Sequence, residues 1–217
     1  MKTNTNENIK IFVIHYKKLV ERKQHIINEF YKHGITNFEF IEIDRDELVE
    51  KDINMFEENY TRSLIAITMS HFYAYKEISK KYDTALILED DVILSDYFLE
   101  KLNGYINELP EDYDMLFIGD GCNMHISNDK LIPGKHIYDK SIKNDGDTIT
   151  RCTDSYLVNK KCATQLCDYI DNIEKKMNSP IDFWLNEPAK ELQFKAYWAE
   201  PTICTQGTQC NLFHRSH

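Results

Sequence analysis

Short apolar runs alternate with amphipathic helical patterns along most of this 217-residue chain. The runs at 9–14, 85–88 and 115–118 have the length of buried strands, whereas 19–33 and 63–80 repeat their apolar side chains at helical spacing. Strands and helices that alternate in this way build a mainly parallel sheet with helices on both faces. We therefore predict an α/β fold in which ligands bind beyond the carboxyl ends of the strands.

Composition favours one domain without an internal linker. The 42% hydrophobic content is enough for a chain of this length to enclose a core. Only 7 Gly and 5 Pro occur, and no segment repeats. We predict a single domain over residues 1–217. Its further strands are expected at 38–43, 155–158 and 194–198, and its further helices at 95–109, 161–173 and from 179 onward.

Hydroxyl side chains mark where two of the helices are predicted to begin. Ser63 is the expected N-cap of one helix, and Ser95 is the expected N-cap of another that ends at Pro110. Elsewhere the periodicity fades. Loops are predicted at 122–150, with a short hairpin near 136–138, and a tail or loop is predicted at 202–217.

The charge balance restricts the partners that this chain is expected to bind. It has 26 Lys and Arg against 36 Asp and Glu, a formal net charge of -10, which repels nucleic acid and anionic lipid. No run approaches the roughly 18 apolar residues that cross a bilayer. We expect a cytoplasmic protein with no nucleic-acid partner, no membrane span and six reduced cysteines, a Cys204–Cys210 disulfide being the alternative. The sequence gives no signal of oligomeric state.

Three carboxylates interrupt the apolar sequence where the run 85–88 ends. Glu89, Asp90 and Asp91 come next, before apolar residues resume at 92–94. Adjacent carboxylates at the end of a buried strand repel one another and lose solvation, so a bound cation is predicted. Mg²⁺ and Mn²⁺ prefer oxygen ligands and leave positions open for a diphosphate. The alternative is a solvated turn in which one acid caps the next helix.

Four segments carry a resemblance to a known family. They are Phe12-Val13-Ile14-His15-Tyr16 with Arg22 downstream, Ser70-His71 with Phe72-Tyr73-Ala74-Tyr75, Ala85-Leu86-Ile87-Leu88-Glu89-Asp90-Asp91-Val92, and Asp154-Ser155-Tyr156-Leu157-Val158 with Pro180-Ile181-Asp182, Glu200-Pro201-Thr202-Ile203 and Gln206-Gly207. Together they resemble glycosyltransferase family 25, which includes lipopolysaccharide sugar transferases and collagen galactosyltransferases. Family openings usually carry Asn and Leu where His15 and Tyr16 stand here. The resemblance implies a GT-A, Rossmann-like fold, a UDP-hexose donor, Mn²⁺ or Mg²⁺, and inversion at the anomeric carbon.

The resemblance also implies metal ligands and a base. Asp91 is expected to contact the metal, with Glu89 and His214 as further ligands, and His217 is the reserve. Asp182 is the expected catalytic base, with Asp154 and Asp120 as substitutes. The alternatives are a solvated histidine at the chain's end and a capping box over 179–182.

The other expected site residues bind the donor nucleotide or its phosphates. Glu89 or Asp90 is expected at the ribose or at a metal-bound water. Arg22 and His71 are expected at the diphosphate, although His71 as a bonded core histidine is the favoured alternative. Trp184 and Trp198 would stack on a sugar or pack in the core. The remaining donor-site residues implied by the resemblance are Ile14, His15, Asp44 and Ser70.

We thus predict a metal-dependent, inverting hexosyltransferase. It would move galactose or glucose from UDP-galactose or UDP-glucose to a hydroxyl of a glycan or of a collagen-like hydroxylysine. The amino-terminal half would bind the nucleotide sugar and the carboxyl-terminal half the acceptor. The alternatives are a metal-dependent phosphohydrolase and a catalytically inactive carbohydrate-binding domain on the same fold.

Overall fold

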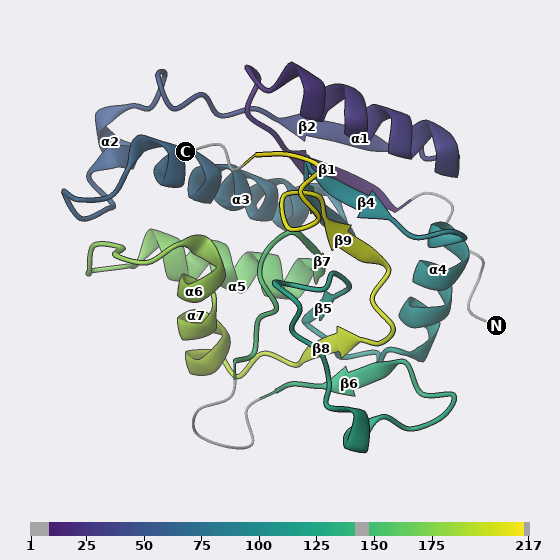
Figure 1. Ribbon diagram of the computed structural model, residues 1–217. Coiled ribbons are helices and arrows are strands. Elements are labelled where there is room, and N and C mark those ends of the chain that lie inside the picture. Colours follow the sequence, from purple (N-terminus) through teal and green to yellow (C-terminus); the bar gives the residue numbers. More distant parts are fainter. Residues whose placement is uncertain (1–8, 142–147, 215–217) are drawn as a thin grey trace.

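A computed structural model describes residues 9–141 and 148–214 of the chain, and it confirms the predicted strand and helix alternation (Figure 1). The described residues form a seven-stranded sheet in the order β2-β1-β3-β7-β5-β8-β6. The strands are β1 Lys10–Ile14, β2 Phe38–Ile41, β3 Thr84–Glu89, β5 Met115–Phe117, β6 Ile137–Asp139, β7 Ser155–Asn159 and β8 Ala196–Ala199. Only β7 and β6 run against the others, so the predicted mainly parallel sheet is confirmed.

Helices cover both faces of this sheet, as predicted. Successive side chains of a strand point to opposite faces, so Phe12 and Ile87 pack in one core and Val13 and Leu88 in the other. The first core is closed by α3 Arg62–Lys81, α5 Lys160–Asp171, α6 Ile181–Trp184 and α7 Asn186–Glu191, and the second by α1 Val20–His33 and α4 Phe98–Glu108. The sequence did not predict the single turn α2 Glu50–Ile53 or the 3-10 turn Asn128–Lys130.

Both predicted serine caps are wrong. The Thr61 side chain caps α3 by accepting from the backbone N–H of Leu64, while Ser63 lies inside the first turn and its Oγ accepts from Arg45 Nη1 at 2.8 Å. In front of α4 the cap is Tyr97, in the left-handed region at φ 59° and without a side-chain cap bond, so Ser95 lies before the helix. Ser63 is thus available to hold an arginine.

A second sheet has two strands and was not predicted. β4 Val92–Leu94 pairs antiparallel with β9 Cys204–Gln206, so the expected tail from 202 is wrong over β9. The expected hairpin near 136–138 is also wrong, because β6 pairs with β8, which is distant in sequence. Cys204 is buried and both it and Cys210 are free thiols, which contradicts the alternative of a disulfide between them.

Within the described part of the chain, no helix combines the length and apolar character that a membrane span needs.

Candidate functional site

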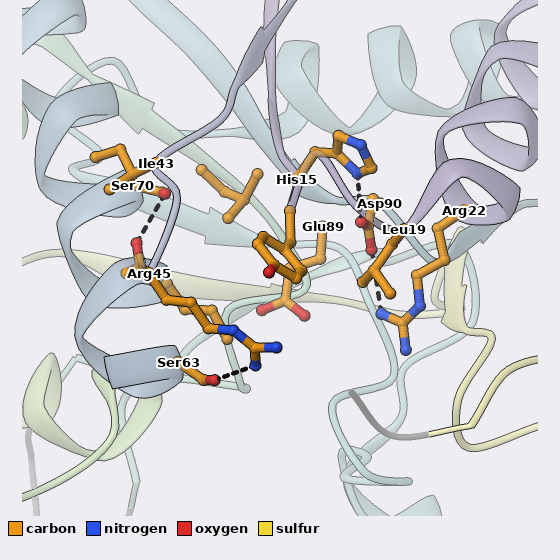
Figure 2. A pocket seen from close by; sticks show the side chains of 13 residues that line it. His15, Leu19, Arg22, Ile43, Arg45, Ser63, Ser70, Glu89 and Asp90 are labelled. Carbon is orange, nitrogen blue, oxygen red and sulfur yellow. Dashed lines mark hydrogen bonds and ion pairs between the residues drawn. The ribbon is translucent and has the colours of Figure 1, made fainter. Parts of the chain in front are cut away.

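A pocket opens at the carboxyl ends of β1 and β3, between α1 and α3. We call it the first pocket. Figure 2 shows Ser63 and Ser70 of α3 on one side and Leu19 and Arg22 on the other, with Glu89 between them. Its remaining lining residues are Ile14, His15, Tyr16, Ile43, Arg45, Ala66, Ile67 and Asp90. The predicted binding edge of the sheet is therefore hollowed where Ile14, His15 and Glu89 leave their strands.

Asp90 organises the basic side of the first pocket. His15, which is buried, places Nδ1 2.7 Å from Asp90 Oδ2, and Arg22 Nη1 donates to Asp90 Oδ1 at 3.1 Å. The same Arg22 nitrogen lies 3.8 Å from Asp91 Oδ2. Both oxygens of Asp90 are therefore used within the protein, and they hold the Arg22 guanidinium beside the pocket.

A second pocket adjoins the first and brings four carboxylates together. We call it the carboxylate pocket. Glu89, Asp91, Asp154 and Asp182 line it, and it shares Arg22, Ile67 and Glu89 with the first pocket. Burial, then the charges of Asp91 and Asp154, raise the pKa of Glu89 well above its usual value. Four acids from three segments of the chain thus line the same pocket as Arg22.

Asp91 and Asp154 are the most deeply buried of these acids. Burial raises the pKa of Asp91, although a hydrogen bond from Thr208 and the charge of Arg22 oppose the shift. Burial also raises the pKa of Asp154 to about 7, with Asp120 and Asp91 contributing. Oδ1 of Asp91 and Oδ1 of Asp154 have no hydrogen-bond partner among the described residues. Each therefore offers an oxygen that the protein leaves unsatisfied.

Close backbone packing fixes Asp154. Its backbone oxygen accepts from the Glu89 N–H at 2.8 Å, and its Oδ2 accepts from Ser155 Oγ at 2.7 Å. A Cβ on Gly119 would lie 2.0 Å from Asp154 Oδ2, so only glycine leaves room for the carboxylate there. The end of β3 and the start of β7 are thereby locked together at the pocket.

The sequence match to a known family covers most of the chain. Residues 8–185 match glycosyltransferase family 25, described as an LPS biosynthesis protein family. The chain belongs to glycosyltransferase family 25. A protein of Acanthamoeba polyphaga mimivirus named "putative glycosyltransferase" is 26% identical over 144 residues, which are 61% of this chain and 43% of that protein. This family 25 chain thus spans less than half the length of that relative.

Two solved structures are also similar to this family 25 chain. One is a glycosyltransferase involved in the glycosylation of the major capsid of PBCV-1, with 11% identity and a TM-score of 0.40, covering 76% of this chain and 68% of the other. The second is the catalytic domain of Drosophila β1,4-galactosyltransferase 7 in complex with xylobiose. It shows 14% identity and a TM-score of 0.43 over 92% of this chain and 67% of that one. The family match and the observed sheet confirm the predicted fold class.

Asp182 lies at the carboxylate pocket on the short helix α6. The alternative of a capping box over 179–182 is wrong, because Pro180 is the N-cap residue and no side chain caps the helix. Asp182 Oδ1 accepts instead from the backbone N–H of Phe183 at 3.0 Å, and burial raises the pKa of Asp182. Capping by Ser179 therefore does not account for Asp182 at this position.

Asp44 and His71 lie outside the linings of the two pockets. Asp44 is buried beside Lys17 Nζ at 3.1 Å and accepts from the Asp46 N–H. His71 is fully buried, with Nδ1 2.8 Å from Tyr156 Oη, and burial lowers its pKa to about 3. It is therefore neutral at pH 7 and has the core position that was the favoured alternative.

Ser70, His214 and the two tryptophans are the other predicted residues that the structure describes. Ser70 lines the first pocket, but its Oγ donates to the Ala66 carbonyl. His214 is exposed and lines a neighbouring hollow, its backbone oxygen accepting from Arg22 Nη2 at 2.8 Å, and His217 lies outside the described residues. Trp184 and Trp198 are buried in the core, so stacking on a sugar is wrong for both.

Several site residues were missed by sequence reasoning. Arg45 lines the first pocket with its guanidinium 4.8 Å from the Tyr16 ring, and its position two residues after the predicted strand at 38–43 was the available signal. The backbone N–H of Thr208 donates to Asp91 Oδ2 at 3.1 Å. It reaches Asp91 only because β9 pairs with β4, and no local sequence pattern predicts that pairing.

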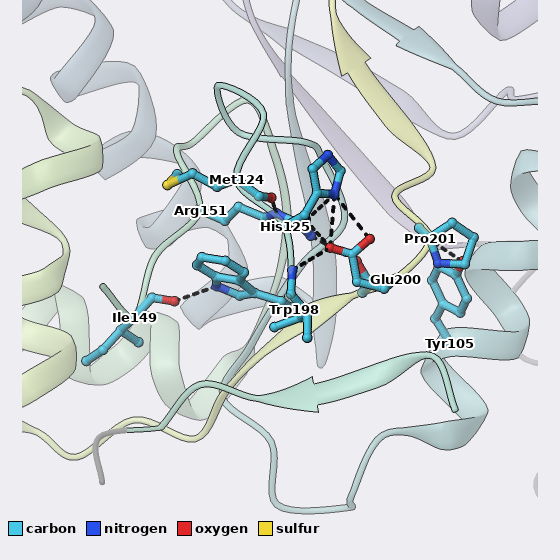
Figure 3. A network of polar contacts seen from close by, with 10 residues as sticks. Tyr105, Met124, His125, Ile149, Arg151, Trp198, Glu200 and Pro201 are labelled. Atoms are coloured by element: carbon cyan, nitrogen blue, oxygen red, sulfur yellow. Dashed lines mark hydrogen bonds and ion pairs between the residues drawn. The ribbon is translucent and has the colours of Figure 1, made fainter. Parts of the chain in front are cut away.

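Arg151 is a buried charged residue next to the loop that leads into the carboxylate pocket. Sequence reasoning did not predict its role either. Figure 3 shows its side chain among His125, Trp198 and Glu200. It donates to the carbonyls of Met124 and Ala199 and pairs with Glu200. The loop that leads into Asp154 is thereby tied to the end of β8.

Proposed function

We propose that this chain transfers a hexose from UDP-galactose or UDP-glucose to an acceptor hydroxyl. The bond between the anomeric carbon and the diphosphate breaks, and the configuration at that carbon is inverted. The observation that carries the proposal is the pair of adjoining pockets that meet at Arg22, Ile67 and Glu89. The first would hold the uridine, with Tyr16 and Arg45 beside the base. The carboxylate pocket would hold the hexose and the attacking hydroxyl. The diphosphate would then lie at their junction, beside the Arg22 guanidinium, the charge that a phosphate prefers.

A divalent cation, Mn²⁺ or Mg²⁺, is proposed at Asp91 with help from Glu89. Support comes from the unpartnered buried Oδ1 of Asp91 and from the carboxylate oxygens of Asp91 and Glu89, which suit either ion. Among residues 9–141 and 148–214, no three His, Cys, Asp or Glu side chains are arranged to hold a metal. His214 as a third ligand therefore stays a prediction. A bound cation would neutralise charge on the departing diphosphate.

Asp182 is the proposed base. Direct displacement with inversion needs a group that takes the proton of the acceptor hydroxyl as the anomeric carbon is attacked. Asp182 lines the carboxylate pocket and has a raised pKa, which brings a carboxylate closer to the range of an effective base. Asp154 also has a raised pKa but is fully buried, so an acceptor reaches it less directly. It is the proposed substitute.

The acceptor is proposed to be a hydroxyl of a glycan, as in a lipopolysaccharide, or of a collagen-like hydroxylysine. The family's description favours the first of these for an initial screen.

Release of UDP from UDP-galactose and UDP-glucose, measured with and without Mn²⁺ and with a glycan acceptor, tests the proposal. We expect Mn²⁺-dependent UDP release that rises when an acceptor is added. Release of UMP and hexose 1-phosphate in place of UDP would identify a phosphohydrolase that cleaves the diphosphate. Donor binding without turnover on any acceptor would identify an inactive carbohydrate-binding domain.

A further inference from the structure

Two cysteine thiols face each other at the edge of the carboxylate pocket. Cys122 Sγ and Cys152 Sγ lie 3.7 Å apart, and both residues line this pocket with Asp154. The mechanism proposed above uses neither thiol. Because the S–S distance of a disulfide is about 2.05 Å, the two sulfurs would need to approach by roughly 1.7 Å to form one. The pair is therefore close to the geometry of a bond.

The two loops that carry these thiols are packed tightly. Cys122 has φ 59° and Cys152 has φ 52°, a region that non-glycine residues occupy when their surroundings hold them there. A Cβ on Gly121 would lie 2.8 Å from the backbone oxygen of Arg151, so the residues before the two cysteines are in direct contact. Arg151 is itself fixed by Glu200. The sulfurs thus stay near each other.

Exposure gives the two thiols different parts in an oxidation. Cys122 is exposed, so a small oxidant reaches it first. Cys152 is half-buried, and burial raises the pKa of its thiol, with Cys122 and Asp154 adding to the shift. A buried, protonated thiol is a poor first nucleophile, but it needs no access from solvent to attack a neighbouring sulfur.

Polar contacts lead from both thiols to Glu89. On one side, Gln209 Nε2 lies 2.9 Å from Cys122 Sγ and donates to Gln206 Oε1, while Gln206 Nε2 lies 3.4 Å from Glu89 Oε2. On the other side, Cys152 precedes Thr153, whose Oγ1 lies 3.5 Å from Glu89 Oε1. Movement of the sulfurs toward each other would therefore shift groups that position Glu89 between the two pockets.

We propose that Cys122 and Cys152 form a reversible disulfide by exchange with a low-molecular-weight disulfide such as oxidised glutathione, and that this bond weakens nucleotide binding. The coupling to nucleotide rests on the proposed function. The Cys122 thiolate attacks one sulfur of the oxidant, whose S–S bond breaks and releases one glutathione thiolate. Cys152 then loses its proton and attacks the Cys122 sulfur, which releases the second. Two protein thiols are oxidised, one glutathione disulfide is reduced to two thiols, and the protons pass to the leaving thiolates.

Oxidised glutathione followed by intact-mass and peptide analysis tests the bond itself. The expected result is the loss of two hydrogens and a crosslinked pair of peptides that contain Cys122 and Cys152, reversed by dithiothreitol. Cys152→Ser should instead retain glutathione on Cys122, because no second thiol can release it. Cys210→Ser is the matched control, since Cys210 is also exposed but lies outside the lining of the carboxylate pocket, and it should form the bond as the parent does.

Calorimetry with UDP and Mn²⁺ tests the coupling. We expect oxidation to weaken UDP binding about fivefold or more and dithiothreitol to restore it, with no comparable effect in Cys152→Ser. A stable glutathione adduct of the parent without the internal bond would overturn the disulfide, and unchanged UDP affinity after bond formation would overturn the coupling. If the reduced protein binds no UDP, the proposed function fails and the coupling with it, while the mass measurement still decides the disulfide.

Discussion

Asp90 and Asp91 are neighbours in sequence but have different partners at the site. Asp90 has both oxygens on His15 and Arg22, whereas Asp91 keeps Oδ1 without a hydrogen-bond partner among the described residues. Asp90 therefore acts on the position of Arg22, and Asp91 is the acid available to a cation. The two roles were not separable in the sequence, because His15 lies 75 residues before Asp90.

Asp91→Asn should weaken Mn²⁺-dependent UDP binding by about tenfold or more, about 1.4 kcal/mol, because a neutral amide is a poorer cation ligand. Burial raises the pKa of Asp91, so its charge opposes folding at neutral pH and the variant should melt no lower than the parent. Calorimetry and thermal unfolding measure the two effects. Asp129→Asn, on an exposed turn, is the matched control. A large fall in melting temperature would assign Asp91 to structure.

Asp154→Asn should gain stability relative to the parent as the pH rises. The Asp154 pKa of about 7 lies above the usual value of 3.8, so the folded chain holds a proton that the unfolded chain releases in this interval. The contribution of Asp154 to the free energy of unfolding therefore falls as the pH rises toward 7, by at most about 4 kcal/mol. Above pH 7 this contribution stays constant. Thermal unfolding of both proteins from about pH 5 to pH 8 measures this. A constant difference in melting temperature would contradict the raised pKa.

At the scale of elements, local patterns were enough to predict β1, α1, β2, β3, β5, β7 and α5 within a few residues. The predictions failed where contacts between residues distant in sequence determine the local structure. Either Thr61 or Ser63 could cap α3 by residue type, and the Arg45 contact occupies Ser63. β9 was missed because three residues of mixed polarity become a strand only by pairing with β4. Tertiary context overrides local propensity at such positions.

Gly119→Ala should destabilise the junction between β5 and β7. The added Cβ would collide with Asp154 Oδ2 and Ser155 Oγ, so we expect a loss of about 1–3 kcal/mol and weaker UDP binding. Denaturant unfolding and calorimetry check both. Gly104→Ala is the matched control, because nothing lies within 4 Å of its Cβ inside α4, and it should be neutral or stabilising. Equal stability of the two variants would argue against the tight contact.

Arg151→Met should cost about 3 kcal/mol or more, because it leaves the buried Glu200 carboxylate without the arginine, with only His125 and the Ile126 N–H in contact with it. Adding Glu200→Gln should recover part of the loss, since the unpaired charge is then gone. Denaturant unfolding of the single and double variants gives the coupling between the two residues. If the losses of unfolding free energy in the two single variants add up to the loss in the double variant, the pair shown in Figure 3 does not act as a unit.

At the scale of the whole molecule, the acidic turn was located correctly from sequence because its carboxylates interrupt a buried strand. The rest of the carboxylate pocket could not be assembled in that way. Asp154 reaches it from the residue before β7, Asp182 from α6, and Thr208 from the turn after β9. Their meeting depends on strand order, including the antiparallel insertion of β7 beside β3, which periodicity does not encode.

The central claim is that the two adjoining pockets form one metal-assisted nucleotide-sugar site. Calorimetric titration of the reduced parent protein with UDP, with and without Mn²⁺, tests it most directly. We predict saturable binding that tightens about tenfold or more when Mn²⁺ is present. UDP affinity that is the same with and without Mn²⁺, or no binding at all, would contradict the claim.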